Sequence, residues 1–218
     1  MGLSLAELAA SFAPSDRGGG DFWSPTKDAQ RFRLYRVYQD GKPSIVGYSE
    51  EKVWTGHAFE TDNEDIAKTR AFLYASGTKE DKAKARALQP RTKAWLVGVL
   101  PDNPTGFVIW KAPSSVVQRI IVLLGTAGNE GLPVAYPKGP DAKFLELVEK
   151  GANSVCGPNG RDFGARCDKS APPASMYDVS LLERTPVIKV LSFSEEEAPD
   201  PAKAAERMYA AMARKKGG

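Results

Sequence analysis

The chain has 218 residues, and its 42% hydrophobic content is enough to bury a core. No apolar run approaches the length of a membrane span and no signal peptide precedes the domain, so we expect a soluble intracellular protein. The net charge of +3 is only mildly basic, so a nucleic-acid footprint requires local clusters of cations. Two cysteines, Cys156 and Cys167, are too few for a disulfide framework and match no zinc-ligand spacing, so we expect no metal or other cofactor.

The first 20 residues are predicted to form an arm. A helix is expected over residues 1–13, because Leu5, Leu8 and Phe12 mark an apolar stripe. The glycine run that ends at Gly20 then predicts a flexible linker. Such a helix either packs on its own domain or docks on a neighbouring copy.

The domain begins with alternating residues. A strand is predicted over Arg31–Tyr38, with Arg31, Arg33 and Tyr35 on one face and apolar residues on the other. A turn then leads to strands over Ser44–Ser49 and Val53–Phe59. Two helices follow, over Asn63–Ala75 and from the cap Thr78 to Leu88.

A β-hairpin and a helix form the centre of the predicted domain. The strands are Lys93–Leu100 and Gly106–Lys111, and the helix starts at a cap provided by Ser114 or Ser115 and ends at Gly125. Lys93 and Trp95 share one face of the first strand, the second ends with Trp110 and Lys111, and Arg91 leads in. Cations interleaved with rings are typical of surfaces that bind single-stranded nucleic acids. The alternative, that the tryptophans are core residues, stays open for each of them.

The last third alternates turns with short elements. A helix is predicted over residues 141–150, and strands over Arg161–Asp168, Tyr177–Glu183 and Val187–Leu191. Arg161, Phe163 and Arg166 again place cations beside a ring. After an acidic linker, Asp200 caps a final helix whose first residue is Pro201.

Three stretches together resemble the single-stranded-DNA-binding proteins of tailed bacteriophages, which have an OB fold. They are FWSPTKDAQRFRLYRV (residues 22–37), ALQPRTKAWLVGVL with GFVIWKAPSSVVQRI (residues 87–120), and GRDFGARCDKSAPPASMYDVSLLER (residues 160–184). The resemblance implies a protein that coats and protects single-stranded DNA during replication, recombination and repair. It also implies a location in the cytoplasm of the infected bacterial host.

The chain departs from that family in two places. Members commonly hold zinc with one His and several Cys before the central hairpin, whereas here the interval has His57 and no cysteine. Four N or S ligands are normally needed, so zinc binding does not carry over. The helices of residues 63–88 take the place of that subdomain, and only the short acidic run at Glu195–Asp200 corresponds to the acidic tail that recruits partners.

An enzyme is not expected. His57 has no nucleophile beside it in the sequence, and the carboxylates Glu60, Asp62, Glu64 and Asp65 are explained by capping and the helix dipole. The competing interpretation is a phage structural or protein-interaction module that binds no nucleic acid.

The predicted fold is α+β and mainly β: a five-stranded OB barrel with a helical insertion at residues 62–89. The domain spans residues 21–191, between the arm at 1–20 and an acidic linker with a C-terminal helix at 192–218. The predicted partners are single-stranded DNA, further copies of the chain through the terminal arms, and replication proteins, with no membrane. The predicted stacking rings are Tyr35, Trp95, Trp110 and Phe163, and the predicted phosphate contacts are Arg31, Arg33, Arg91, Lys93, Lys111, Arg161 and Arg166.

Overall fold

The structure is a computed structural model of the chain, and it describes residues 22–216 except 40, 56–57, 90, 174 and 184–191. The predicted helix of residues 1–13, His57 and the predicted strand Val187–Leu191 therefore lie outside the described residues.

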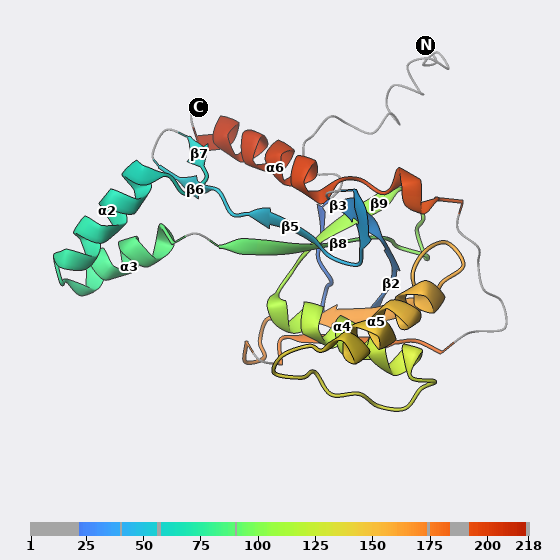
Figure 1. The fold of residues 1–218 in the computed structure, drawn as a ribbon. Helices are drawn as coiled ribbons and strands as arrows, with labels where there is room; N and C mark the ends of the chain where they lie inside the picture. The colour runs from blue at the N-terminus through green and yellow to red at the C-terminus, as the bar shows by residue number, and fades with distance from the viewer. Residues whose placement is uncertain are drawn as a thin grey trace, which may run out of the picture.

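One large mixed sheet organises the molecule (Figure 1). Its strands lie in the order β1-β9-β8-β2-β10-β11, and β5 also pairs with β8. Among the strands that the structure describes in this sheet, only β1 and β9 pair in parallel. The strands are β1 (Phe22–Trp23), β2 (Gln30–Tyr35), β5 (Gly47–Glu50), β8 (Thr92–Val99), β9 (Phe107–Ala112), β10 (Asp162–Cys167) and β11 (Tyr177–Leu181). Two small ribbons pair β3 (Val37–Gln39) with β4 (Lys42–Ser44), and β6 (Val53–Trp54) with β7 (Phe59–Glu60).

The predicted α+β class is confirmed, and the five-stranded barrel is not. The large sheet has seven strands, and the described residues form no closed barrel. The long strand β8 is shared on one edge: its first half pairs with β5, and its second half pairs with β2. Strands β5 and β2 therefore extend from β8 in different directions (Figure 1).

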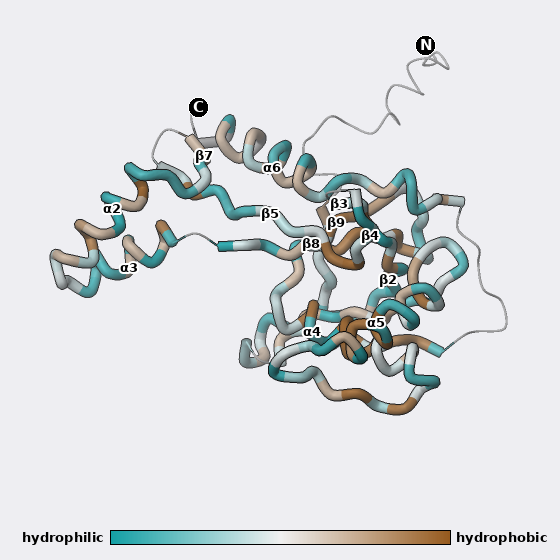
Figure 2. Tube along the Cα trace, viewed as in Figure 1, coloured by the Kyte–Doolittle hydropathy of each residue, from teal (hydrophilic) through white to brown (hydrophobic). Residues whose placement is uncertain are grey.

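The predicted central hairpin is present, with β8 and β9 antiparallel and Val99 opposite Phe107. Its alternation separates two cores, because successive side chains of a strand point to opposite faces. Leu96 packs in the core beneath α4 (Ser114–Gly128) and α5 (Ala142–Val155), whereas Trp95 and Val97 pack on the opposite face. In Figure 2 hydrophobic segments gather where the sheet meets α4 and α5.

Helix α4 differs from its prediction at both ends. Pro113 occupies the N-cap position, so Ser114 and Ser115 are the first helical residues and neither is the cap. The helix also continues past Gly125 to Gly128. There it crosses α5 so closely that a Cβ on Gly128 would collide with the carbonyl of Leu147, and one on Gly151 with the carbonyl of Leu124.

The C-terminal helix α6 (Pro201–Lys216) covers the other face of the sheet (Figure 1). Ala204, Ala205 and Tyr209 pack against Trp95 and its neighbours. A short 3-10 turn, η1 (Glu195–Glu197), precedes it. The apolar side of this helix is thus occupied within its own chain.

The two predicted insertion helices are confirmed as α2 (Glu64–Ala75) and α3 (Lys79–Ala87), with Asn63 and Thr78 as their N-caps. They form a helical hairpin that stands away from the body of the molecule (Figure 1). From here on, the arm means α2 and α3 together, and not the terminal arms predicted from the sequence. Within the part of the chain that the structure describes, no helix is long and apolar enough to cross a membrane.

Candidate nucleic-acid interface

The four rings predicted to stack on bases lie in the interior. Tyr35, Trp95 and Phe163 have no exposed surface, and Trp110 is 1% exposed. A stacking ring must offer a free face to a base. None of the four does so in this conformation, and both tryptophans are core residues.

Trp95 is the predicted ring whose surroundings match the sequence pattern best. Its indole Nε1 donates to Ser49 Oγ at 2.6 Å, and Lys111 Nζ lies 5.8 Å from the ring centroid. A cation thus lies over this indole as the pattern suggested, but it is Lys111 of β9 and not the predicted Lys93. Helix α6 covers the indole of Trp95. The contact between Lys111 and Trp95 therefore stabilises the fold, and the ring is not accessible to a ligand.

The other three rings complete aromatic clusters. Trp110 meets Trp23 edge-on at a centroid distance of 5.3 Å, and Phe163 lies in the same core. Tyr35 meets Phe107 edge-on at 5.1 Å, and its hydroxyl donates to the carbonyl oxygen of Phe193 at 3.1 Å. Burial raises the pKa of Tyr35 to about 12, so its phenol is neutral at ordinary pH.

Several of the predicted phosphate contacts are internal. The guanidinium of Arg33 is buried and donates to Asp162 Oδ1 at 2.7 Å, while Arg31 bonds the other carboxylate oxygen through Nε at 3.0 Å. Arg161 donates to the carbonyl oxygen of Leu182 at 3.0 Å and 2.6 Å. These bonds hold strands β2, β10 and β11 together, so Arg33 and Arg161 have structural roles.

Glu51 brings two of the predicted cations together. Its carboxylate accepts Lys93 Nζ at 3.0 Å and Lys111 Nζ at 3.3 Å. Burial alone raises the pKa of Glu51, but the hydrogen bonds and charges of the two lysines outweigh it and leave that pKa below its usual value. The two lysines and the Glu51 carboxylate together therefore carry one net positive charge at neutral pH.

The remaining cations are exposed and dispersed. Arg166 forms a surface ion pair with Asp178 at 3.0 Å on β10 and β11, Arg31 keeps 43% of its side chain exposed, and Arg91 is exposed before β8. Among the predicted site residues, the structure thus gathers Lys93 and Lys111 at Glu51 beside Trp95, and Arg31 and Arg33 at Asp162.

A pocket that sequence reasoning missed lies between the start of β8 and the start of α4. It has a volume of about 370 Å3, and we call it the tyrosine pocket because Tyr48 and Tyr136 line it. The rings are 46% and 41% exposed. Burial first, and then the nearby Tyr136, raise the pKa of Tyr48, so its phenol stays neutral. The remaining lining includes Thr92, Lys93, Ala94, Ala112, Ser114 and Gln118.

The sheet register explains the space in front of Tyr48. Tyr48 of β5 lies opposite Ala94 of β8, which lies opposite Ala112 of β9. Two small side chains beside a tyrosine leave room that larger residues would fill. The small residues opposite Tyr48 become apparent only when β5, β8 and β9, which come from separate stretches of the sequence, are aligned. The sequence alone therefore did not indicate the pocket.

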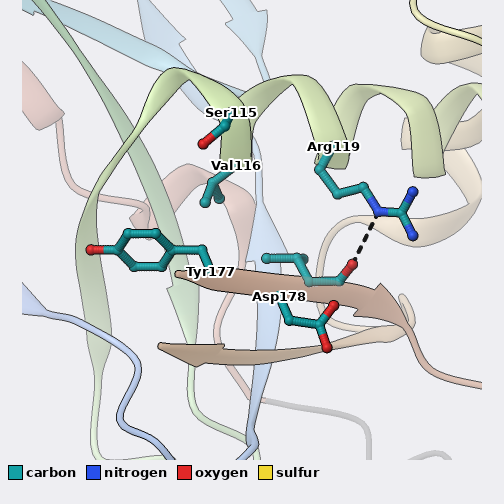
Figure 3. Close-up of a pocket in the computed structure, with 6 residues that line it drawn as sticks. Ser115, Val116, Arg119, Tyr177 and Asp178 are labelled. Atoms are coloured by element: carbon teal, nitrogen blue, oxygen red, sulfur yellow. Dashed lines mark hydrogen bonds between the residues drawn. The ribbon is translucent and has the colours of Figure 1, made fainter. Parts of the chain in front are cut away.

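A second pocket, of about 250 Å3, lies on the other side of the α4 N-terminus, and we call it the arginine pocket (Figure 3). Ser115 and Arg119 of α4 face Tyr177 and Asp178 of β11 across it. Arg119 is exposed and donates through Nε to the carbonyl oxygen of Val179 at 3.3 Å, which fixes the guanidinium over the strand.

The first turn of α4 separates the two pockets. Ser114 lines the tyrosine pocket and Ser115 lines the arginine pocket. The turn has no acidic residue, and its N-cap Pro113 makes no side-chain bond to the free N–H groups. Helix N-termini with free N–H groups favour anions, so the ridge between the pockets is electropositive.

Besides the two pockets, the described residues include possible metal ligands and the thiol of Cys156. No group of three or more His, Cys, Asp or Glu among them is placed to hold a metal ion. Burial raises the pKa of the Cys156 thiol to about 12, so it is protonated and a poor nucleophile at neutral pH. What the described surface provides at the two pockets is rings, cations and hydrogen-bond donors.

Comparison with known proteins adds no relative: no family model, no curated protein and no solved structure matches the chain.

Proposed function

We propose that the chain binds single-stranded DNA without strong sequence preference, with the tyrosine pocket as the principal contact. The observation that carries the proposal is the exposure of two tyrosine rings on one pocket that Lys93 also lines. Stacking on rings beside cations holds an unpaired strand whatever its sequence, because every base has a π-face.

The surroundings of the pocket suit the alternation of base and phosphate. Bases would enter between Tyr48 and Tyr136, and the phosphates would lie toward the electropositive start of α4. Beyond that ridge, Arg119 and Tyr177 in the arginine pocket repeat the combination of a cation with a ring. The path therefore accommodates more than one nucleotide. The four buried rings named by the sequence have no contact role in this proposal.

We propose that the sheet is of the OB type. Support comes from the central position of β2 between β8 and β10, and from the sharing of one edge of β8 between β2 and β5. This strand order and this shared edge are both expected of a strongly coiled sheet, and an OB barrel is such a sheet. Pairing that would close the sheet is absent among the described residues, and the predicted strand Val187–Leu191 lies outside them.

The biological setting follows the resemblance described above. The chain would coat and protect single-stranded DNA during phage replication and recombination in the cytoplasm of the infected host. Replication proteins and further copies of the chain are its proposed partners.

One observation favours the competing function of a protein-interaction module. Phe72 on the arm is 74% exposed, and Leu132 is 63% exposed. Exposed large apolar side chains are found at surfaces that bind protein. A protein-interaction module of this kind would not bind DNA.

The test is fluorescence anisotropy of labelled oligo(dT), with Tyr48→Ala and Tyr136→Ala as variants. We expect the unmodified chain to bind the single strand and to prefer it to duplex. Each variant is expected to lose roughly 1 to 3 kcal/mol of binding free energy, the usual worth of one stacked base.

The matched control is Tyr38→Ala, because Tyr38 is 54% exposed and lines neither pocket. Binding by this control at the strength of the unmodified chain would assign the loss to the tyrosine pocket. If the unmodified chain fails to bind oligo(dT) even at low salt, the nucleic-acid function is wrong and the interaction module replaces it.

A further inference from the structure

One side of the exposed surface of α3 carries cations and no acid. A residue turns by roughly 100° along an α-helix, so Lys79, Lys82 and Arg86 fall within about 60° of one another. All three are exposed, whereas half-buried Asp81 lies away from them around the helix, with buried Ala85 between Asp81 and Lys82. We call these three residues the basic stripe.

The stripe differs from the other cations of the arm in its partners. Lys84 pairs with Glu80 at 3.3 Å, Lys68 with Glu64 at 2.8 Å, and Arg70 with Asp62 at 2.9 Å. Within the part of the chain that the structure describes, no ion pair or side-chain hydrogen bond involves Lys79, Lys82 or the guanidinium of Arg86. The stripe thus keeps its full charge for a ligand.

The stripe leads along the chain to the tyrosine pocket. Arg91 donates to the carbonyl oxygen of Arg86 at 3.4 Å, so its guanidinium lies at the end of α3. Thr92 and Lys93, the next two residues, line the pocket. The arm itself extends outward beyond the end of the β5–β8 ribbon (Figure 1). Cations therefore run along the chain from the pocket to α3, the helix of the arm that leads into β8.

We propose that the basic stripe is a second phosphate-binding surface, which holds the DNA strand after it leaves the tyrosine pocket. This inference rests on the proposed function and extends it, because the stripe would lengthen the strand that one copy covers. The protruding arm would then be a guide for the backbone of the nucleic acid.

The chemistry of the stripe favours a phosphate backbone over other ligands. Its three cations are separated by about 4.5 and 6 Å along the helix axis, a spacing suited to a series of anions. Ala83 is the other residue on that face. A protein hot spot normally has an aromatic or other buried anchor, and a membrane-binding helix has apolar residues to insert. The stripe has neither, so repeated negative charge is the ligand it fits.

The test compares Lys79→Ala/Lys82→Ala with a control that removes the same charge elsewhere. The control is Lys143→Ala/Lys150→Ala on α5, where both lysines are exposed. Alanine at position 79 removes a cation from the start of a helix, so α3 is not weakened. Binding is measured by anisotropy with oligo(dT) of about 6 and about 30 nucleotides, the short one within the site of a single OB-type surface.

We expect the stripe variant to bind the short oligonucleotide normally and the long one several-fold more weakly. Its log-log salt slope on the long strand should be flatter by about 1.4, because each lost single-strand phosphate contact contributes about 0.7. The control should bind both lengths like the unmodified chain.

The opposing results are distinct. Equal losses in stripe and control variants, or no loss in the stripe variant on the long strand, would overturn the stripe while leaving the pocket intact. Failure of the unmodified chain to bind either length would overturn the proposed function and the stripe together.

Discussion

At the scale of single residues, Asp162 illustrates how charge is used inside this protein. Its carboxylate is 5% exposed and lies between the guanidinium groups of Arg31 and Arg33. Arg33 also donates to the carbonyl oxygen of Pro158 at 2.7 Å. A cation so deeply buried depends on its acceptors, because little water reaches it.

Replacing Asp162 by alanine removes the carboxylate partner from buried Arg33. We expect a loss of roughly 3 to 5 kcal/mol in the free energy of unfolding, as for other broken buried ion pairs. Asp178→Ala is the matched control, because that carboxylate is 58% exposed and pairs with exposed Arg166. The control should lose less than about 1 kcal/mol. Urea denaturation measures both, and equal losses would show that burial of the pair contributes nothing.

Tyr35 predicts a response of stability to alkaline pH. Its pKa is raised from 10.0 to about 12 in the folded chain, so the folded state keeps a proton that the unfolded state releases. Its contribution is fully present below pH 10 and is lost as the pH rises toward 12, by at most about 1.4 kcal/mol per pH unit.

The measurement is urea denaturation from pH 9 to 11 of the unmodified chain and of Tyr35→Phe. We expect stability to fall more steeply with pH in the unmodified chain, because phenylalanine has no proton to release. Parallel pH dependences would mean that Tyr35 is accessible enough to ionise normally.

The residue scale also shows why the sequence misassigned the stacking rings. Alternation correctly placed Lys93 and Trp95 on one face of β8, and the structure has both beside Lys111 and Glu51. The alternation of residues along a strand does not show which other segment covers each face. The covering residues Ala205 and Tyr209 come from a helix far along the chain. Tyr48 and Tyr136, which remain exposed, were given no role.

At the scale of secondary-structure elements, local signals were the reliable ones. Thr78 caps its helix as predicted, and Asn63 and Asp141, where the other two helices were predicted to begin, are also N-caps. Each accepts a bond from a backbone N–H in the first turn. Glycine was the exception. Gly125 was predicted to end α4, yet it lies within the helix, where close packing and not chain reversal requires a small residue.

The crossing of α4 and α5 gives a prediction at this scale. A methyl group on Gly151 would meet the backbone of Leu124, which cannot turn aside as a side chain does. We expect Gly151→Ala to lower the free energy of unfolding by roughly 1 to 3 kcal/mol, although alanine in a helix interior is ordinarily favourable. Thermal unfolding measures the change. Gly139→Ala is the control, because open space surrounds that position and its effect should be small.

At the scale of the whole molecule, the class of fold was predictable and its closure was not. Hydrophobic periodicity identifies strands and helices one at a time, so the α+β class and the helical insertion followed from it. Strand order depends on pairings between distant segments, such as Phe163 with Phe32 and Trp23 with Trp110. No local pattern specifies these registers, and the sharing of β8 between β2 and β5 was not foreseen.

The molecule also divides its sheet between two uses. The face beneath α6 is filled by a core that includes Trp95, Val97 and Ile109. The tyrosine pocket opens instead beside α4, on the side of Ala94 and Ala112. The proposed DNA path thus runs along an edge shared by strand and helix, and the arm continues it outward.

The packing of α6 has a consequence for biosynthesis. Trp95 and Val97 leave the ribosome long before Ala204, Ala205 and Tyr209, which cover them in the finished protein. The emerging polypeptide therefore carries an uncovered apolar surface until translation has passed Tyr209, and the contacts between these distant segments slow folding. A chaperone that protects nascent chains would find its binding site on that face.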